Sequence, residues 1–146
     1  MSARAVPADV IEVIPYDDTQ FGEVDALWRA VFPEDPPHSH ATVAIPQKLA
    51  VQRDLFLVAV EGGRVLGTVL AGYDGHRGWL YKLAVHPNAR HCGIGTKLVR
   101  AAERKLAARG CTKLNLQVRA GNDEAARFWA RMGYGEEPII SMGRLL

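Results

Sequence analysis

Residues 79–109 read WLYKLAVHPNARHCGIGTKLVRAAERKLAAR and contain, in order, an apolar strand, a glycine-bounded turn and a helix. Val85 ends the apolar run, Pro87 breaks it, and Gly93 and Gly95 open the helix. The first turn of a helix leaves backbone N–H groups without intrahelical partners, and the helix dipole adds partial positive charge at the same place. The turn is therefore suited to binding a phosphate group.

The distribution of charge points to the same turn. The chain has a formal net charge of +2, which is too small to indicate a nucleic-acid partner. Residues 90–113 hold seven lysines and arginines and one glutamate, so this segment has a net charge of +6 and the remainder −4. Such a concentration suits a small polyanion better than a long phosphate backbone. We therefore expect no nucleic-acid partner.

The length and composition are those of one globular domain. A chain of 146 residues, 48% apolar and 23% charged, is long enough to bury a sizeable core. We expect a single domain over 9–146 and a flexible leader over 1–8.

Cys92 and Cys111 form neither a disulfide framework nor a metal-ligand spacing. No apolar run reaches 18 residues and the N-terminus lacks the apolar centre of a signal peptide, so we expect a cytoplasmic protein that binds no membrane, as a monomer or homodimer.

Apolar periodicity and turn residues predict an alternation of strands and helices. The expected elements are a strand at 10–14, helices at 19–32 and 41–54, strands at 55–60, 64–73 and 79–85, a helix from about 95 to 109, a strand at 114–118, a helix from 122 to about 132, and one or two short strands in 134–146. Asp18 or Thr19 is expected to cap the first helix.

Connection lengths then predict the topology. Three consecutive strands joined by short turns, the first at Gly62-Gly63, should form an antiparallel meander. The strands at 79–85 and 114–118 flank a helix and should run parallel. The expected fold class is α/β (α+β), with one mixed central sheet and helices on both of its faces.

Two phosphate-binding motifs fail to match the turn. A P-loop needs a glycine where Arg90 stands, and here Thr96 precedes Lys97 rather than following it. A dinucleotide fingerprint needs a glycine where Leu98 stands.

The pattern that is present is Leu83-Ala84-Val85-His86-Pro87 followed by Arg90-x-x-Gly93-Ile94-Gly95-Thr96-x-Leu98. It resembles the acetyl-CoA-binding motif of the GNAT (general-control-type N-acetyltransferase) superfamily. Downstream, Asn122-x-x-Ala125-x-x-Phe128-Trp129-x-x-Met132-Gly133-Tyr134 resembles the second motif of that family. The order of elements matches over residues 9–146. The turn YDGHRG at 73–78 is further similar to the YpeA-type bacterial members.

The resemblance implies acetyl-CoA as cosubstrate. Backbone groups from His91 to Thr96 would hold its pyrophosphate, the strand edge before them would hydrogen-bond its pantetheine arm, and Asn122 would reach the same arm. The cofactor-binding residues implied in this way are Leu83, Ala84, Val85, Arg90, His91, Cys92, Gly93, Ile94, Gly95, Thr96 and Asn122. The plain alternatives are a tight turn at the glycines and a surface position for Arg90, and Cys92 is expected to contribute only its backbone.

The catalytic residues depart from the family pattern. Relatives carry proton-transfer groups at the positions of Trp79, Tyr81, Gln117 and Trp129, and only Tyr81 keeps a plausible one here. Alternation along the strand places on one face Trp79, Tyr81, Leu83 and Val85. Tyr81 is therefore our candidate catalytic acid, and a pocket-lining tyrosine with a satisfied hydroxyl is the alternative.

The resemblance implies direct transfer of acetyl from acetyl-CoA to a primary amine of a small molecule or protein, entering beside the 33–47 loop and the 74–78 turn. The alternative is a non-catalytic acyl-CoA-binding or regulatory protein of the same fold. Asp74 and His76 are candidates for contacting the acceptor, with a solvated turn as the plainer reading. His38 and His40 lack a third ligand at a recognisable spacing, so we expect no metal.

Overall fold

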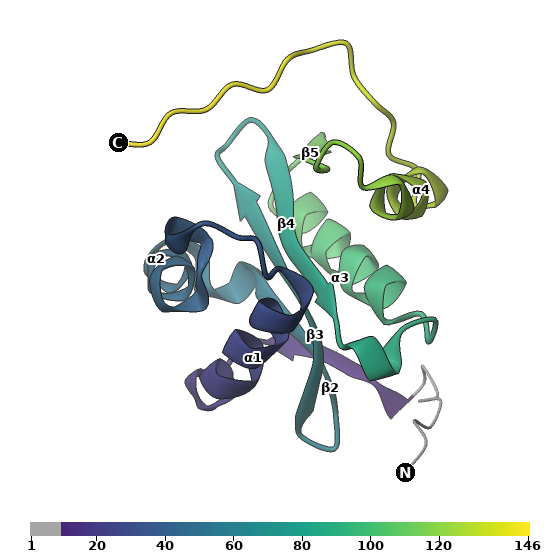
Figure 1. The fold of residues 1–146 in the computed structure, drawn as a ribbon. Helices are drawn as coiled ribbons and strands as arrows, with labels where there is room; N and C mark the ends of the chain where they lie inside the picture. The colour runs from purple at the N-terminus through teal and green to yellow at the C-terminus, as the bar shows by residue number, and fades with distance from the viewer. Residues whose placement is uncertain (1–9) are drawn as a thin grey trace. The chain divides into compact units, whose positions relative to one another are not determined.

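The computed structural model describes residues 10–146, and the leader expected at 1–8 lies outside the described residues. The described chain forms five strands, four α-helices and four short 3-10 helices (Figure 1). In order these are β1 (Glu12–Pro15), η2 (Asp18–Gln20), α1 (Phe21–Val31), η3 (Pro37–Ser39), α2 (Ala41–Gln52), η4 (Arg53–Leu55), β2 (Phe56–Glu61), β3 (Arg64–Tyr73), β4 (Gly78–Val85), η5 (Pro87–Ala89), α3 (Ile94–Ala108), β5 (Leu114–Leu116) and α4 (Asp123–Arg131).

The five strands form one sheet in the order β1-β2-β3-β4-β5. The first four strands pair antiparallel, and β4 pairs with β5 in parallel. Both predicted features, the antiparallel meander and the parallel crossover through α3, are confirmed. The hairpin between β2 and β3 turns at Gly62 and Gly63, both of which have positive φ.

Helices cover both faces of this sheet, as predicted: α1 and α2 lie on one face and α3 lies on the other (Figure 1). On the α1 side, the ring of Phe56 stacks on Tyr16 at 4.3 Å and on Trp28 at 6.0 Å between centroids. On the α3 side, a Cβ on Gly67 would lie 2.8 Å from the backbone oxygen of Ala84 and 3.0 Å from Leu98 Cδ1. Glycine at this position therefore allows α3 to pack directly against the sheet.

The first helix begins differently from the prediction. Asp17, rather than Asp18 or Thr19, is the capping residue, and it caps the short helix η2 that leads into α1. Its carboxylate accepts the backbone N–H of Thr19 at 2.9 Å, while Gln20 Oε1 accepts the N–H of Asp17 at 2.9 Å. This reciprocal pair is a capping box, and it moves the start of the helical turn one residue earlier than the apolar pattern suggests.

The chain divides into two compact units, one ending at Leu116 and a smaller one at Gln117–Leu146. In the smaller unit, Trp129 makes edge-to-face contacts with Phe128 at 5.1 Å and Tyr134 at 5.2 Å. The prediction of one or two strands in the tail 134–146 is wrong, because none forms there. Pro138 lacks a backbone N–H, and apolar residues without a hydrogen-bonded neighbour do not make a strand.

The helices of the described chain include none with the length and apolarity needed to cross a membrane.

Candidate active site

β4 loses its neighbouring strand β5 partway along its length, so that one of its edges is unpaired from there on in the described chain. The ladder between β4 and β5 comprises Gly78, Trp79 and Leu80 and goes no further. From Tyr81 to Val85, β4 continues beside β3 while its other edge has no strand partner among the described residues. Backbone N–H and C=O groups on such an edge can hydrogen-bond an extended ligand as a neighbouring strand would.

A β-bulge interrupts β4 at the start of this open edge. Thr68 pairs with Ala84 and Leu70 pairs with Tyr81, so the single residue between them on β3 faces Lys82 and Leu83 on β4. Lys82 has a φ of 53°, which is uncommon for a residue other than glycine. The bulge therefore puts one extra residue into β4 and bends it.

Because of the bulge, the expected row of side chains on one face is wrong. Tyr81 lies on the face of α2, where its ring is 5.7 Å from Lys48 Nζ. Val85 pairs with Gly67, whose missing side chain would point at α3. Since paired residues share a face of a sheet, Val85 lies on the opposite face from Tyr81. Trp79 stays on the Tyr81 side, because it pairs with Gly72, whose Cβ would lie 3.6 Å from Lys48 Nζ.

The open edge leads through η5 into the glycine turn. His91 and Gly93 have φ values of 66° and 77°, and Gly93 precedes the first residue of α3. No side chain caps this helix, so the N–H groups of its first turn face outward without a local acceptor from a capping residue. The predicted cofactor residues 83–85 and 90–96 thus lie on one continuous path from a strand edge to a helix start.

The side chains along this turn are used in different ways. Arg90 is exposed, and Ile94 is buried, so Ile94 presents only its backbone. The thiol of Cys92 lies 3.6 Å from the backbone oxygen of Arg90. Asn122 belongs to the smaller unit, where its Oδ1 accepts the backbone N–H of Ala125 at 3.1 Å and caps α4.

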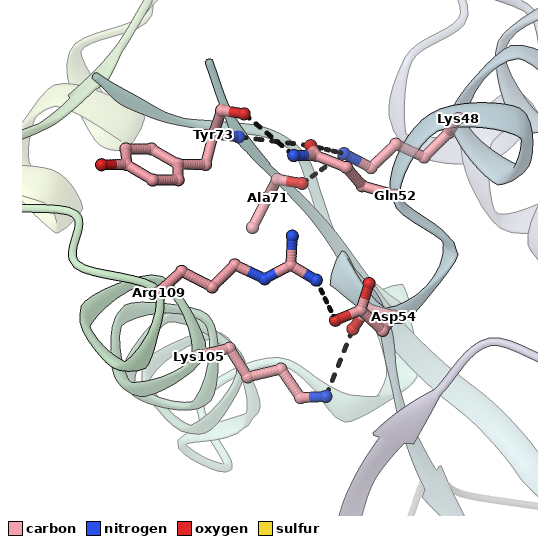
Figure 2. A network of polar contacts seen from close by, with 7 residues as sticks. All are labelled: Lys48, Gln52, Asp54, Ala71, Tyr73, Lys105 and Arg109. Carbon is pink, nitrogen blue, oxygen red and sulfur yellow. Dashed lines mark hydrogen bonds and ion pairs between the residues drawn. The ribbon is translucent and has the colours of Figure 1, made fainter. Parts of the chain in front are cut away.

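The basic residues of α3 are spread along the helix rather than gathered at the turn. α3 has 15 residues, which correspond to a length of about 22 Å. At its far end, Arg109 pairs with the carboxylate of Asp54 and Lys105 Nζ donates to the backbone oxygen of Asp54 at 3.2 Å (Figure 2). An anion placed at the turn would therefore be held largely by backbone N–H groups and the helix dipole.

Tyr81, the predicted proton donor, lies half in solvent on β4. Its exposed fraction is 44%, and partial burial raises the pKa of its hydroxyl, which stays protonated at neutral pH. The other positions weighed for proton transfer are Trp79, which is partly exposed on the same strand, and Gln117 and Trp129 in the smaller unit. The side-chain amide of Gln117 donates to Ser141 Oγ.

Lys48 is a buried amine beside Tyr81 that the sequence reading missed. It is 6% exposed, and its Nζ donates to the backbone oxygen of Ala71 and to Gln52 Oε1 at 3.3 Å (Figure 2). Burial, and secondarily the positive charge of Arg109, lowers the pKa of Lys48 to about 8, while Asp54 acts in the opposite direction. A lysine in a weakly amphipathic helix carries no sequence signal of this burial.

Gln52, one turn after Lys48, completes this contact with β3. Its Nε2 donates to the backbone oxygen of Tyr73 at 2.9 Å, and its Oε1 accepts the N–H of Tyr73 at 3.2 Å (Figure 2). The ladder of β2 with β3 spans Phe56 to Glu61 and reaches only Leu70 on β3. Lys48 and Gln52 therefore satisfy backbone groups of β3 beyond the end of its neighbouring strand.

Some of the polar side chains near the expected acceptor entrance already make hydrogen bonds to the backbone, namely Asp74 and His40. Asp74 Oδ1 accepts the backbone N–H groups of Arg77 and His76, each at 2.8 Å, and these bonds lower the pKa of its carboxyl. His40 Nε2 lies 2.9 Å from the backbone oxygen of Asp35, while His38 and His76 are exposed. Within residues 10–146 no three His, Cys, Asp or Glu side chains gather as metal ligands would.

Comparisons with known proteins agree with this geometry. Residues 21–134 match the family model described as the acetyltransferase (GNAT) family. Acetyltransferase SG1711 of Sodalis glossinidius (strain morsitans) is 40% identical over 140 residues, which cover 93% of this chain and 94% of that protein.

Among solved structures, the aminoglycoside N-acetyltransferase AAC(6')-Iy in complex with CoA is similar with a TM-score of 0.73 and 18% identity, covering 92% of this chain and 94% of that one. The ribosomal-protein-S18-alanine N-acetyltransferase from Escherichia coli has the same TM-score and 18% identity, covering 87% of this chain and 79% of that one. At these identities the likeness concerns the fold. The match to the family model and the 40% identity to the Sodalis protein show that the chain belongs to the GNAT family of acetyltransferases.

Proposed function

We propose that the chain transfers an acetyl group from acetyl-CoA to a primary amine of a small molecule or protein by direct attack of the amine. One observation carries this proposal: the open edge of β4 leads directly into the uncapped start of α3. An extended ligand that ends in a diphosphate matches this path, because it needs strand-like hydrogen bonds first and backbone N–H groups later. AAC(6')-Iy, which shares the fold, is described with CoA bound.

The residues present fit such a cosubstrate. Leu83, Ala84 and Val85 would hold the pantetheine arm along the open edge, and the backbone from His91 to Thr96 would hold the pyrophosphate. Left-handed conformations at His91 and Gly93 turn the chain so that the N–H groups of the helix start are presented together. Exposed Arg90 is placed to add a charged contact to a phosphate. Asn122 is assigned to the arm by family resemblance.

Tyr81 is the proposed proton donor. When bound, acetyl-CoA supplies the activated acetyl group, and the protein has to align the amine and supply a proton to the departing thiolate. The Tyr81 hydroxyl has an ordinary pKa of 10.0 and is therefore protonated at neutral pH; burial raises this pKa further, and the side chain lies directly before the bulge. No other side chain of β4 between Gly78 and Val85, apart from the ion-paired Lys82, carries an ionisable proton.

The proposed acceptor is a primary amine, on either a small molecule or a protein. Relatives that share the fold act on an aminoglycoside in one case and on a protein alanine in another. We propose that the acceptor enters beside residues 33–47 and 74–78. The cytoplasmic location, the state of monomer or homodimer and the independence from a metal stay predictions.

The cofactor assignment is tested by Gly95→Glu, which places a carboxylate in the first turn of α3. We expect CoA binding, measured by calorimetry, to be lost while the circular dichroism spectrum stays that of the wild type. Gly22→Glu is the matched control, because it adds the same side chain to the first turn of α1 at an exposed position with open space. Unchanged CoA affinity in Gly95→Glu would refute the assignment.

Catalysis is tested separately by measuring thiol release from acetyl-CoA over a panel of amines, peptides and polyamines. Release that depends on one class of amine identifies the acceptor class. Tight CoA binding without thiol release on any of them would instead favour an acyl-CoA-binding or regulatory protein.

A further inference from the structure

A partly buried ion pair joins the bulge of β4 to the loop between α1 and α2. Lys82 Nζ contacts the carboxylate of Asp35, and the two side chains are only 10% and 12% exposed. The same Nζ lies 4.9 Å from the ring centroids of Trp28 and Phe32. The ammonium group of Lys82 is thus enclosed by one carboxylate and two aromatic faces.

The backbone of the bulge is held from the same side. Trp28 Nε1 donates to Thr68 Oγ1 at 2.9 Å, and Thr68 Oγ1 donates to the backbone oxygen of Lys82 at 2.9 Å. Thr68 is fully buried, so its hydroxyl and its bond with Trp28 are shielded from water, while the bond to Lys82 is partly buried. The left-handed conformation of Lys82 is therefore fixed by contacts to both its side chain and its carbonyl group.

The loop is held at the other end of the ion pair. Asp35 lies between Phe32 and the short helix η3, and its backbone oxygen is 2.9 Å from His40 Nε2 at the start of α2. The Asp35–Lys82 pair therefore connects the proposed acceptor side with the residue immediately before the proposed pantetheine edge.

We propose that Asp35 and Lys82 are positioning residues for acetyl transfer, which hold the loop 33–40 and the bulge of β4 in one mutual arrangement. The proposal rests on the proposed function, since it assigns the edge after Lys82 to the cosubstrate. A buried ion pair contributes little net stability compared with apolar residues of similar volume, but its two charged groups must meet in one relative position. An apolar pair would fill the space without fixing the bulge, and the reacting groups need alignment to within a fraction of an ångström.

The experiment compares Asp35→Leu/Lys82→Met with each single substitution. Each single variant removes one member of this ion pair from a partly buried site, so we expect a lower Tm. The double variant removes both charges, and we expect it to regain most of the wild-type Tm. Its CoA Kd, measured by calorimetry, should stay at least fivefold weaker, and its kcat/KM on an amine found in the panel at least tenfold lower.

The control is Arg29→Gln, which breaks the ion pair Asp25–Arg29 on the exposed surface of α1. It should leave the Tm, CoA Kd and kcat/KM unchanged. A double variant that regains the Tm together with wild-type CoA affinity and turnover would show that the pair is merely structural, and would overturn the proposal.

Asp35→Asn keeps the shape of the side chain and provides a second test if the double variant does not fold. Folded Asp35→Asn with wild-type CoA affinity and kcat overturns the proposal, whereas weaker affinity and lower kcat in the folded protein support it. A wild type that fails to bind CoA would refute the proposed function itself, whereas a wild type that binds CoA with unaffected variants refutes only the positioning role.

Discussion

Replacement of Lys48 by methionine tests whether a charged amine is buried beside Tyr81. Lys48 is 6% exposed and its pKa is lowered to about 8, first by burial and then by Arg109. An unfolded chain gives the same amine its ordinary pKa of 10.5. Between these two values the unfolded state binds more protons than the folded state, so the free energy of unfolding rises with pH. This stabilisation is complete above the unfolded pKa and is lost as the pH falls through the folded pKa.

The magnitude follows from the two pKa values. Each pKa unit corresponds to about 1.4 kcal/mol, so the full difference amounts to about 3 kcal/mol. Over the accessible interval from pH 7 to pH 9.5 the gain should be about 2 kcal/mol, because the folded amine loses its proton in this interval while the unfolded amine mostly keeps it. Methionine fills a similar volume and does not titrate, so Lys48→Met lacks this gain.

Urea unfolding followed by tryptophan fluorescence at pH 7, 8, 9 and 9.5 measures the difference between wild type and Lys48→Met. Hydrogen bonds lost to Ala71 and Gln52 lower the stability of the variant by a similar amount at every pH, so only the slope reports the charge. Gln47→Met, at the exposed preceding position of α2, should run parallel to the wild type. If wild type and Lys48→Met also run parallel, the ammonium is solvated and the reasoning is wrong.

Three further substitutions test other parts of the structure. Activity that depends on a protonated Tyr81 should fall above pH 10, because burial raises the pKa of this hydroxyl above its ordinary value. Tyr81→Phe should lower kcat and remove this fall. A pH–rate profile of the variant that keeps the wild-type rate and its alkaline limb would exclude the acid role. Gly67→Ala should lower the free energy of unfolding by about 1–3 kcal/mol, because the new Cβ would lie 2.8 Å from the backbone oxygen of Ala84. Gly22→Ala is the control, since its Cβ would lie in open space on a helix and should not lower the stability. Thermal unfolding of the two variants measures the difference. Gly93→Ala should cost about 1–2 kcal/mol through its φ of 77° alone, as nothing lies within 4 Å of its Cβ, and an unaltered urea midpoint would contradict that.

Several features could be predicted because they depend on neighbouring residues. β3 runs from Arg64 to Tyr73 as predicted, since the glycines before it and the turn residues after it determine the backbone locally. The parallel pairing of β4 with β5 follows from a helix of sufficient length between them. The glycine turn before α3 was likewise visible from spacing, because an uncapped helix start is a local property of the chain.

Other features depend on residues that meet only in the folded protein. Alternation along 79–85 predicted one row of side chains, but β3 offers one residue opposite two of β4, and a bulge is a mismatch between two strands rather than a property of one. Asp35 and Lys82 are separated by 47 positions, so their ion pair has no local pattern.

The order of the elements as far as α4, the antiparallel meander and the glycine turn before α3 could be predicted from the sequence alone, because hydrophobic period, glycines and connection length act over a few residues. The face on which Tyr81 lies, the burial of Lys48 and the contacts that hold Lys82 at the bulge depend on the packing of the folded chain. Burial and the pKa of a buried group arise from packing against distant segments, and these distances are set only when the sheet and its two helical layers come together.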